Sequence, residues 1–260
     1  MKSWFDESPE VYERARPSYP PALWDALFAV LPSAPRILEI GAGTGKATHA
    51  LLSRGAAVLA CEPGPNLARF MTQKFAPEIR KRKLEVRAEF FEDMDIDAQS
   101  FDAVVAATCW HWLDPGSCLQ KAATALKRNG ALAVVDTMQV DDAIDRGFFA
   151  ASHPIYQRYF AEPDRTAQLP GRNLTPAVFD ALNASDTFGQ STLARFNWDQ
   201  GYATAQYIDL VRSYSNTAML VPTVREHFLQ DLATFIDTEF AGFVLRPLVI
   251  TLVVARLPRV

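Results

Sequence analysis

The segment Ile37–Gly45, with the sequence ILEIGAGTG, constrains the fold of this chain more than any other feature. An apolar run typical of a buried strand leads directly into three glycines at alternate positions, and a helical stretch, Lys46–Ser53, follows. Glycine lets the backbone turn sharply and lets a ligand approach the main chain. The helix that follows supplies free N–H groups at its start. The segment therefore predicts a strand–loop–helix unit that binds a ligand at the carboxyl end of its strand.

Short apolar runs alternate with amphipathic stretches through the first half of the chain. The runs predict strands at Ile37–Ile40, Ala57–Cys61, Leu84–Ala88, Ala103–Ala106 and Ala131–Val135. The stretches between them predict helices at Lys46–Ser53, Pro65–Phe75 and Pro115–Lys127, the last of them ended by Asn129-Gly130. Such an alternation predicts right-handed βαβ units that build a parallel sheet.

The late part of the chain predicts an ending for this sheet. Leu193–Trp198 and Leu248–Leu257 have the composition of strands, and Ala203–Ser213 and Val224–Phe240 between them have that of helices. We expect an antiparallel hairpin there. The predicted fold class is α/β, with a Rossmann-like, doubly wound, seven-stranded and mostly parallel sheet whose C-terminal strand is antiparallel.

A single domain is expected to span residues 1–260, because two separate domains would be cramped in this length. Residues 1–35 predict an N-terminal helical arm with a helix near Ala22–Leu31. A cofactor-binding core of residues 36–140 follows. Residues 141–188, rich in aromatics, Pro and Asp, predict an inserted helical cap, and residues 189–260 complete the sheet.

Charge and composition exclude several classes of function. The net charge is −4 and the pI about 5.6, so no global basic field attracts nucleic acid, and the run Arg80–Lys83 is interpreted as a solvated loop. The three cysteines have no CxxC spacing and the four histidines are scattered, which argues against a disulfide framework and a metal site. The N-terminus has no apolar signal core and no stretch is apolar enough to span a bilayer, so we expect a soluble, cytoplasmic protein.

Two carboxylates beside the glycine loop limit the class of ligand that it can bind. Glu62 stands about twenty residues after Gly41, at the end of the next predicted strand, where a carboxylate can accept hydrogen bonds from two ribose hydroxyls. Glu39, just before the loop, disfavours a pyrophosphate and favours an ammonium group. Lys46 stands where a dinucleotide-binding loop has a third small residue. A nicotinamide or flavin dinucleotide, and a tight turn without a ligand, are the alternatives.

The segment EIGAGTGKAT and the strand-end Glu62 resemble the first two motifs of class I S-adenosylmethionine-dependent methyltransferases, and SFDAVV and ALKRNGALAVVD resemble later ones. The segments FDESPEVYERARPSYP, CWHWLDP and LVRSYSNT resemble a small-molecule subgroup akin to trans-aconitate methyltransferases. The resemblance covers nearly the whole chain and implies S-adenosylmethionine as the cofactor. The residues implied at its methionine and ribose ends are Glu39, Gly41, Gly43, Gly45 and Glu62.

The same resemblance implies further site residues. The loop after the third strand contacts adenine in this family, which implicates Glu89 and Phe90, with the neighbouring Phe91 as the other choice for the aromatic contact. The alternative is that these residues belong to the core at a strand end. Trp110 follows the fourth strand, where an aromatic face attracts a sulfonium by about 1 kcal/mol. His111 is either a general base, with an ordinary pKa near neutrality, or a residue that shapes the pocket.

The N-terminal arm also carries candidate cofactor residues. In similar proteins the RPxYP-type segment folds over the cofactor, which implicates Arg16 and Tyr19. The Arg16 guanidinium suits a carboxylate of the cofactor or of the substrate. An exposed arm with a surface arginine is the alternative. In the predicted cap, Arg165 and Arg172 are open candidates for binding an anionic acceptor, and the sequence does not choose between them.

The expected function is in-line transfer of a methyl group from S-adenosylmethionine to a small-molecule acceptor, for which the resemblance suggests a carboxylate. No partnership with nucleic acid or membrane is expected, and the sequence leaves the oligomeric state open. Two rivals remain: a dinucleotide-dependent oxidoreductase, and a non-catalytic protein that binds S-adenosylmethionine. The second rival persists because this chemistry needs no invariant nucleophile that a sequence could reveal.

Overall fold

The computed structural model describes residue 6 and residues 9–160 and 169–258. Its centre is a seven-stranded sheet with the strand order β3-β2-β1-β4-β5-β9-β6. Neighbouring strands from β3 to β5 are parallel, whereas β9 runs antiparallel to both β5 and β6. The strands are β1 (Arg36–Ile40), β2 (Ala57–Cys61), β3 (Leu84–Arg87), β4 (Phe101–Ala107), β5 (Leu126–Gln139), β6 (Thr192–Asn197) and β9 (Leu248–Arg256). The predicted fold class is thereby confirmed.

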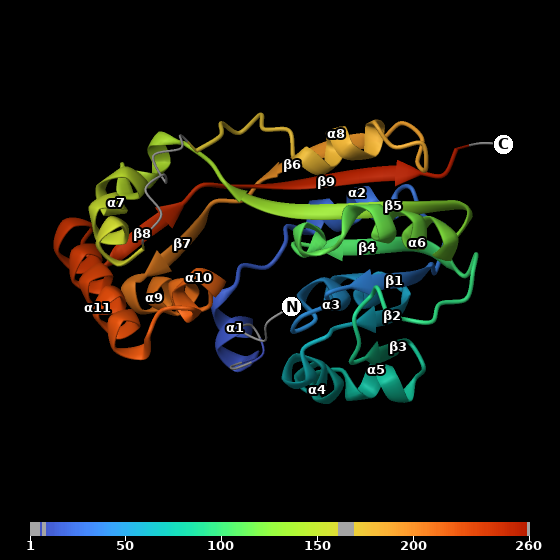
Figure 1. Ribbon diagram of the computed structural model, residues 1–260, viewed down its shortest axis with the longest axis horizontal. Helices are drawn as coiled ribbons and strands as arrows, with labels where there is room; N and C mark the ends of the chain where they lie inside the picture. The colour runs from blue at the N-terminus through green and yellow to red at the C-terminus, as the bar shows by residue number, and fades with distance from the viewer. Residues whose placement is uncertain (1–5, 7–8, 161–168, 259–260) are drawn as a thin grey trace.

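Helices cover both faces of the sheet, because successive strand residues point to opposite sides and both sides are apolar (Figure 1). In β1, Ile37 belongs to the core on one face and Leu38 to the core on the other. One face is covered by α2 (Pro21–Phe28), α3 (Lys46–Ser53) and α4 (Pro65–Lys74), followed by α5 (Ala76–Arg80). The other face is covered by α6 (Pro115–Ala125) and α8 (Ala177–Asn183).

A separate apolar cluster forms a cap beyond one end of the sheet, at the left of Figure 1. Its centre contains Phe148 and Phe228, both fully buried, and their rings lie among other aromatic side chains. The cap consists of α7 (Phe148–Tyr159), α9 (Thr204–Arg212), α10 (Ser215–Ala218), α11 (Pro222–Glu239) and a two-stranded sheet of β7 (Gln200–Ala203) and β8 (Phe243–Arg246). The cap faces the carboxyl ends of the parallel strands.

Helix α1 (Pro9–Ala15) lies between the cap and the sheet (Figure 1). Its last residue, Ala15, is buried in the cap cluster. On the sheet side, the Asp6 carboxylate accepts hydrogen bonds from the backbone N–H groups of Asn66 (2.7 Å) and Leu67 (2.8 Å) at the start of α4. Glu13 accepts from Lys74 at 2.7 Å. The arm therefore bridges the two parts of the molecule.

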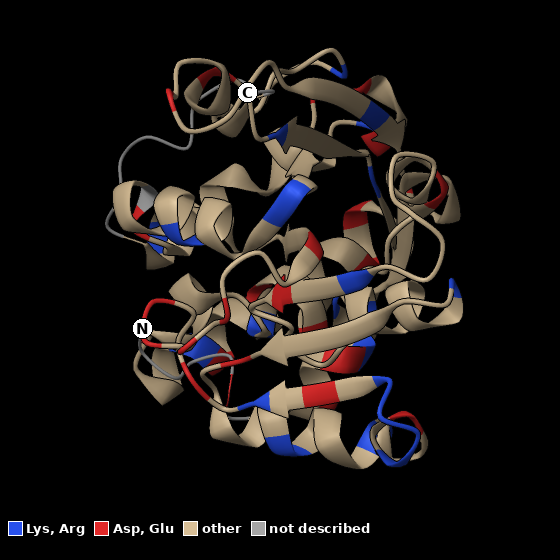
Figure 2. Ribbon diagram, turned by 90° about the vertical axis from the view of Figure 1, so that its right-hand side faces the viewer, with Lys and Arg blue, Asp and Glu red and all other residues tan. Residues whose placement is uncertain are grey.

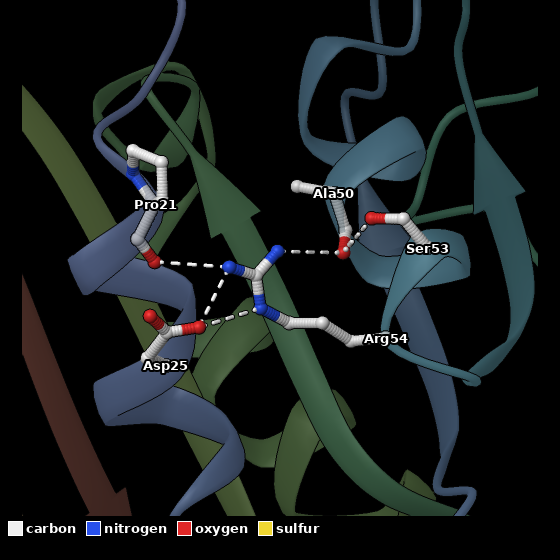
Figure 3. Close-up of polar contacts among 5 residues, drawn as sticks. All are labelled: Pro21, Asp25, Ala50, Ser53 and Arg54. Carbon is white, nitrogen blue, oxygen red and sulfur yellow. Dashed lines mark hydrogen bonds and ion pairs between the residues drawn. The ribbon is translucent and has the colours of Figure 1, made fainter.

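Helix α2 is fixed to α3 by Arg54, which follows the last turn of α3 (Figure 3). Its guanidinium donates to the carboxylate of Asp25 at 2.7 and 3.0 Å and to the carbonyl oxygens of Pro21 and Ala50. The predicted arm of residues 1–35 thus divides in two, because α2 packs on the sheet and only α1 reaches the cap.

The largest differences from the predicted boundaries lie at α6 and β5, since β5 extends beyond Ala131–Val135 at both ends. Helix α6 ends at Ala125 rather than Lys127, and Asn129-Gly130 lie inside β5 instead of ending a helix. The reason is that Leu126 is fully buried and pairs with Phe101, so the chain is already extended there. The register then shifts before Ala131, as in a β-bulge.

The predicted antiparallel pair at the end of the sheet is confirmed. Strands β6 and β9 are antiparallel neighbours, and α9, α10, α11 and the small sheet lie between them along the chain. The cap differs in extent from residues 141–188. Of the helices in that segment, α7 joins the cap, whereas α8 buries Val178 and Leu182 against the sheet. Helices from residues 189–260 supply the rest of the cap.

Charged side chains of both signs are interspersed along the ribbon (Figure 2). The basic run Arg80–Lys83 starts at the last residue of α5 and forms the loop before β3, and all four residues are exposed. Across the described part of the chain, each helix is too short or too polar to cross a membrane. Nor do the described residues hold a cluster of three or more His, Cys, Asp or Glu side chains that fits a metal ion.

Candidate active site

The glycine loop after β1 adopts a conformation that side chains disfavour. Gly41, Gly43 and Gly45 have φ angles of +61°, +59° and +81°. A Cβ atom on Gly41 would lie 2.9 Å from the Cβ of Cys109, and one on Gly45 would lie 2.4 Å from the Phe75 ring. Around Gly43 the nearest side-chain atom stands at 3.8 Å. The loop is thus tightly packed on its inner side and open at its middle glycine.

Glu62, at the end of β2, is held by the loop itself. Its two carboxylate oxygens accept one hydrogen bond each, from the N–H groups of Gly43 and Gly64, both at 2.8 Å. The side chain is buried, and burial raises the pKa of Glu62 against the lowering effect of these N–H groups. A carboxylate oxygen has two lone pairs, so each keeps acceptor capacity for another donor.

Glu39, the last but one residue of β1, lies beneath the same loop and is fully buried. It accepts a hydrogen bond from the Thr48 hydroxyl at 2.6 Å. Burial raises the pKa of Glu39 to about 8, although Thr48 lowers it in part. The side chain lines a cavity and is therefore placed to gain a cationic partner, which would favour its ionised form.

Two adjoining cavities of about 550 and 170 Å³ lie between the carboxyl ends of the strands and the cap. The larger is bounded on the sheet side by the glycine loop, Glu62 and the residues after β3 and β4, and on the cap side by α10 and the end of β8. Residues shared by both cavities are Tyr12, Arg16, Gly41, Gly43, Ala107, Thr108, Tyr214 and Arg246. A volume of this size suits a cofactor together with a small molecule.

In the segment after β4, the first tryptophan, Trp110, does not lie where the sequence predicted. Trp110 is buried in the core beneath α6 and does not line the cavity. His111 and Trp112 line it instead, with their ring centroids 5.0 Å apart. A cofactor contact of Trp110 stays a prediction that this geometry does not support, because Trp112 is the tryptophan of this segment that lines the cavity.

The residues after β3 divide in a similar way. Phe90 lines the cavity, with 37% of its surface exposed, whereas Glu89 does not line it and lies 3.9 Å from Arg87. Gly45 also lies outside the lining; it starts α3, beneath Phe75. Its role in the loop is therefore conformational.

The arm brings both of its predicted residues to the site. Arg16 lines both cavities, and its guanidinium donates to the hydroxyl and the carbonyl oxygen of Ser213 at 3.0 and 2.9 Å. The hydroxyl of Tyr19 shares a hydrogen bond with that of Thr108 at 3.0 Å, in the smaller cavity. Burial raises the pKa of Tyr19, so this phenol stays protonated. Among the lining residues of the arm, Tyr12 lies nearest the open face of Gly43.

One carboxylate near the site was not predicted from the sequence. Asp136, in β5, is partly buried; burial raises its pKa, and the charge of His111 opposes this effect. The two side chains are thus within electrostatic reach of one another. Nothing in the strand pattern around Asp136 distinguished it from an ordinary polar residue at the end of a strand.

The cap side of the cavity contains the arginine that sequence reasoning missed. Arg246, at the end of β8, donates to the Tyr214 hydroxyl at 2.5 Å and to the side-chain oxygen of Gln139. Of the two arginines predicted for an anionic acceptor, Arg165 lies outside the described residues. Arg172 is paired with Asp142 and Asp199 at 2.6 and 2.9 Å. No motif in the sequence singled out Arg246.

The sequence comparisons agree with this geometry. The methyltransferase domain family matches residues 38–134, which contain the glycine loop, Glu62 and β4. An uncharacterized methyltransferase of Mycobacterium bovis is 36% identical over 136 residues, and an uncharacterized methyltransferase of Schizosaccharomyces pombe is 33% identical over 128 residues. These matches cover 52% and 48% of this chain, respectively, and the same shares of the relatives. The chain thus spans about half the length of the curated relatives it matches.

Solved structures extend the likeness in fold to nearly the whole chain. A protein of Anaeromyxobacter dehalogenans, provisionally assigned as a type II methyltransferase, superposes with a TM-score of 0.59 at 20% identity, over 92% of this chain and 95% of that one. A phosphoethanolamine N-methyltransferase of Haemonchus contortus, in complex with phosphomonomethylethanolamine and S-adenosylhomocysteine, superposes with a TM-score of 0.54 at 14% identity, over 98% and 58%. Residues 38–134 thus resemble the methyltransferase domain family, and the fold as a whole resembles that of solved methyltransferase structures. The chain's place in the trans-aconitate subgroup stays a prediction.

Proposed function

We propose that the chain transfers a methyl group from S-adenosylmethionine to a small-molecule acceptor within the larger cavity. The observation that carries this proposal is the junction of two features. A strained glycine loop and a strand-end carboxylate, Glu62, open on one side of the cavity, and His111, Trp112 and the cap form the other. The first feature suits a cofactor, and the second leaves room for an acceptor.

The residues present fit S-adenosylmethionine. The open face of Gly43 lets a ligand approach the backbone, and Glu62 retains lone pairs for ribose hydroxyls. Glu39 offers its carboxylate to the ammonium group, and Phe90 offers an apolar surface to the adenine. A role for Arg16 at the cofactor carboxylate follows from its place in both cavities.

The chemistry supplied by the cofactor is a methyl group already activated by a sulfonium charge. The chain then has to align the acceptor atom opposite the methyl group and to exclude water. The bond from methyl to sulfur breaks as the bond to the acceptor forms. An acceptor hydroxyl or amine also loses a proton, for which His111 is the candidate base, whereas a carboxylate needs none.

A binding comparison separates this proposal from the dinucleotide rival. S-adenosylhomocysteine is expected to raise the melting temperature in proportion to the logarithm of its concentration, and NAD to leave it unchanged. Glu62→Gln should abolish most of that shift, while Glu85→Gln, an exposed carboxylate on β3, should retain it. Stabilisation by NAD alone would overturn the proposal.

The acceptor itself can be found by incubating the protein with labelled cofactor and a metabolite extract, followed by mass spectrometry of the labelled product. Cofactor binding without any labelled product would favour the non-catalytic rival. Once the acceptor is known, His111→Asn tests the base. A proton-removing role predicts a loss of turnover that shrinks as pH rises, whereas a shaping role predicts a higher KM with an unchanged pH profile.

We also propose that the chain acts as one domain in the cytoplasm. The cap and the sheet share the cavity, and α1 packs against both, which supports a single unit. The cysteines, Cys61, Cys109 and Cys118, are all unpaired thiols, as is usual in a reducing compartment. Localisation of a tagged protein by cell fractionation tests the second part.

A further inference from the structure

We propose that the cap side of the cavity binds the acceptor by an oxyanion group, an ionised carboxylate or phosphate, and that Arg246 is the residue that holds it. The inference rests on the proposed function, because it assigns the acceptor half of the same cavity. Arg246 is a binding and specificity residue here; the transferred methyl group need not go to the group it holds.

The argument starts from the partners of Arg246. One terminal nitrogen donates to the Tyr214 phenol at 2.5 Å and the other to the amide oxygen of Gln139. Both acceptors are neutral. The remaining Nε–H is buried and has no hydrogen-bond partner in the described structure. The guanidinium keeps its full positive charge at any accessible pH, so neutral partners position it without balancing it.

In other arginines of the protein, carboxylates neutralise the charge of the guanidinium. Arg172 pairs with two carboxylates, and Arg212 pairs with Glu226 at 2.5 and 3.0 Å. Within the described residues, Arg246 has no carboxylate within ion-pair distance. Its guanidinium is nevertheless more deeply buried than that of Arg212, and three tyrosine side chains surround it. A charge in such a place is costly unless something pairs with it.

The position of Arg246 indicates that the missing anionic partner is a ligand in the cavity. Arg246 lines both cavities, so the uncompensated charge faces space that a ligand can enter. Tyr214 ties it to a second cation, since the Arg16 guanidinium lies 4.7 Å from the centre of the Tyr214 ring. The carboxylates that line these cavities, Glu39, Glu62 and Glu92, belong to the sheet side. The cap side therefore attracts an anion and the sheet side a cation.

Guanidinium geometry favours an oxyanion over other anions, because its planar N–H groups match two oxygens of a carboxylate or phosphate. These two groups share the chemistry that the site recognises. Their difference in charge and shape lets an experiment tell them apart, and a neutral analogue of the same size provides the reference.

The test is isothermal titration of the full chain in low-salt, phosphate-free buffer at pH 7.5, with and without saturating S-adenosylhomocysteine. The probes are succinate, inorganic phosphate and the neutral succinamide. We expect succinate or phosphate to bind and succinamide not to bind. Arg246→Gln should weaken the bound anion at least about tenfold, and Arg246→Lys less, because lysine keeps the charge but loses the planar fork.

Arg158→Gln is the matched control, since it removes the same charge from an exposed position on α7 and should leave anion binding unchanged. Thermal melts establish that each variant folds, and Arg246→Lys serves alone if Arg246→Gln does not. The proposal is overturned if no anion binds the wild type at 20 mM (a threshold on the order of a weak fragment), or if Arg246→Gln binds it equally well.

A third outcome is also decisive. Loss of S-adenosylhomocysteine affinity in Arg246→Gln, with anion binding retained, would make Arg246 a cofactor residue and overturn the inference. Failure of the wild type to bind S-adenosylhomocysteine at all would instead overturn the proposed function. The anion titration without cofactor reports on Arg246 in either case, so the two failures are distinguishable.

Discussion

The two sides of the cavity are built in opposite ways. On the sheet side, a short stretch of chain from Glu39 to Glu62 supplies the glycine loop and two carboxylates that line the cavities. On the cap side, residues far apart in sequence, Arg16, Tyr214 and Arg246, come together, and their charge is positive. One side is a local motif, and the other exists only through long-range packing.

This difference separates the part of the site that the fold itself creates from the part that is specific to this protein. Parallel strands end at one edge of a sheet, so a loop after β1 and a carboxylate after β2 meet wherever this fold forms. The cap has no such rule, because the positions of α1, α10 and β8 depend on their own packing. The sheet side therefore suits a shared cofactor, and the cap side suits an acceptor specific to this protein.

The largest expected effect on binding comes from a substitution in the glycine loop. Gly41→Ala should abolish detectable binding of S-adenosylhomocysteine and destabilise the fold by about 2–3 kcal/mol, since a left-handed residue costs about 1–2 kcal/mol before the clash with Cys109 is added. Calorimetric titration and denaturant unfolding measure the two effects.

The control is Gly55→Ala, where φ is +89° but no atom lies within 4 Å of the new Cβ. It isolates the backbone cost, and we expect it to lower stability while leaving cofactor affinity intact. Equal loss of affinity in both variants would show that general destabilisation, and not the loop, controls binding.

Next comes the carboxylate at the end of β2. Glu62→Gln leaves one oxygen for two N–H donors, those of Gly43 and Gly64, and one of them loses its partner at a cost of about 1–3 kcal/mol. S-adenosylhomocysteine affinity should fall about 10- to 100-fold, because each 1.4 kcal/mol is a factor of about ten. Affinity unchanged within twofold would remove Glu62 from the cofactor site.

The stability of the protein should depend on pH through Glu39. Its pKa is about 8 in the folded chain against an ordinary 4.5, so the folded state keeps a proton that the unfolded state releases. Stability should therefore fall as pH rises from about 5 to about 8. Glu39→Gln should flatten this decline and be the more stable form at pH 8, by roughly 2–5 kcal/mol.

Unfolding free energies at pH 5, 6.5 and 8 (values chosen to span about the window above) measure that effect. Saturating S-adenosylmethionine should reduce the difference between wild type and variant at pH 8, because an ammonium group favours ionised Glu39. A wild type whose stability rises across this window relative to Glu39→Gln would contradict the assignment.

The smallest effect is expected away from the cavity. Arg54→Met removes the bonds that join α3 to α2 (Figure 3), and it should cost about 1 kcal/mol, because Asp25 is largely exposed and solvent screens the pair. Affinity for S-adenosylhomocysteine should not change. A large loss of affinity would mean that α2 transmits strain to the loop, so that the sheet side is less local than it looks.

Sequence reasoning anticipated the sheet well because burial on both faces leaves strong signals. The early strands and the helices between them lie close to their predicted bounds, except for β5 (Leu126–Gln139), which extends well beyond Ala131–Val135 at both ends. The loop has the predicted glycine geometry. The end of α6 was missed because burial of Leu126 overrides the helical tendency of the residues that follow. Packing, and not local preference, set that boundary.

Prediction of the site was less complete for the same reason. The motif after β4 indicated that an aromatic side chain reaches the cavity, but which tryptophan does so depends on the turn, and Trp112 takes the place expected for Trp110. Arg172 was a fair candidate by composition. Its pairing with Asp142 and Asp199 appears only when three distant segments meet.

The sequence by itself determined the strand–loop–helix unit, the carboxylate at the next strand end and the likeness to methyltransferase domains, since period and spacing along the chain specify contacts between adjacent strands. Only the tertiary structure decided which side chains face the cap. Arg16, Tyr214 and Arg246 are separated by most of the chain, and their meeting depends on the packing of α1, α9 and the small sheet. No short-range pattern records such a contact, because its energy comes from surfaces that become neighbours only after folding.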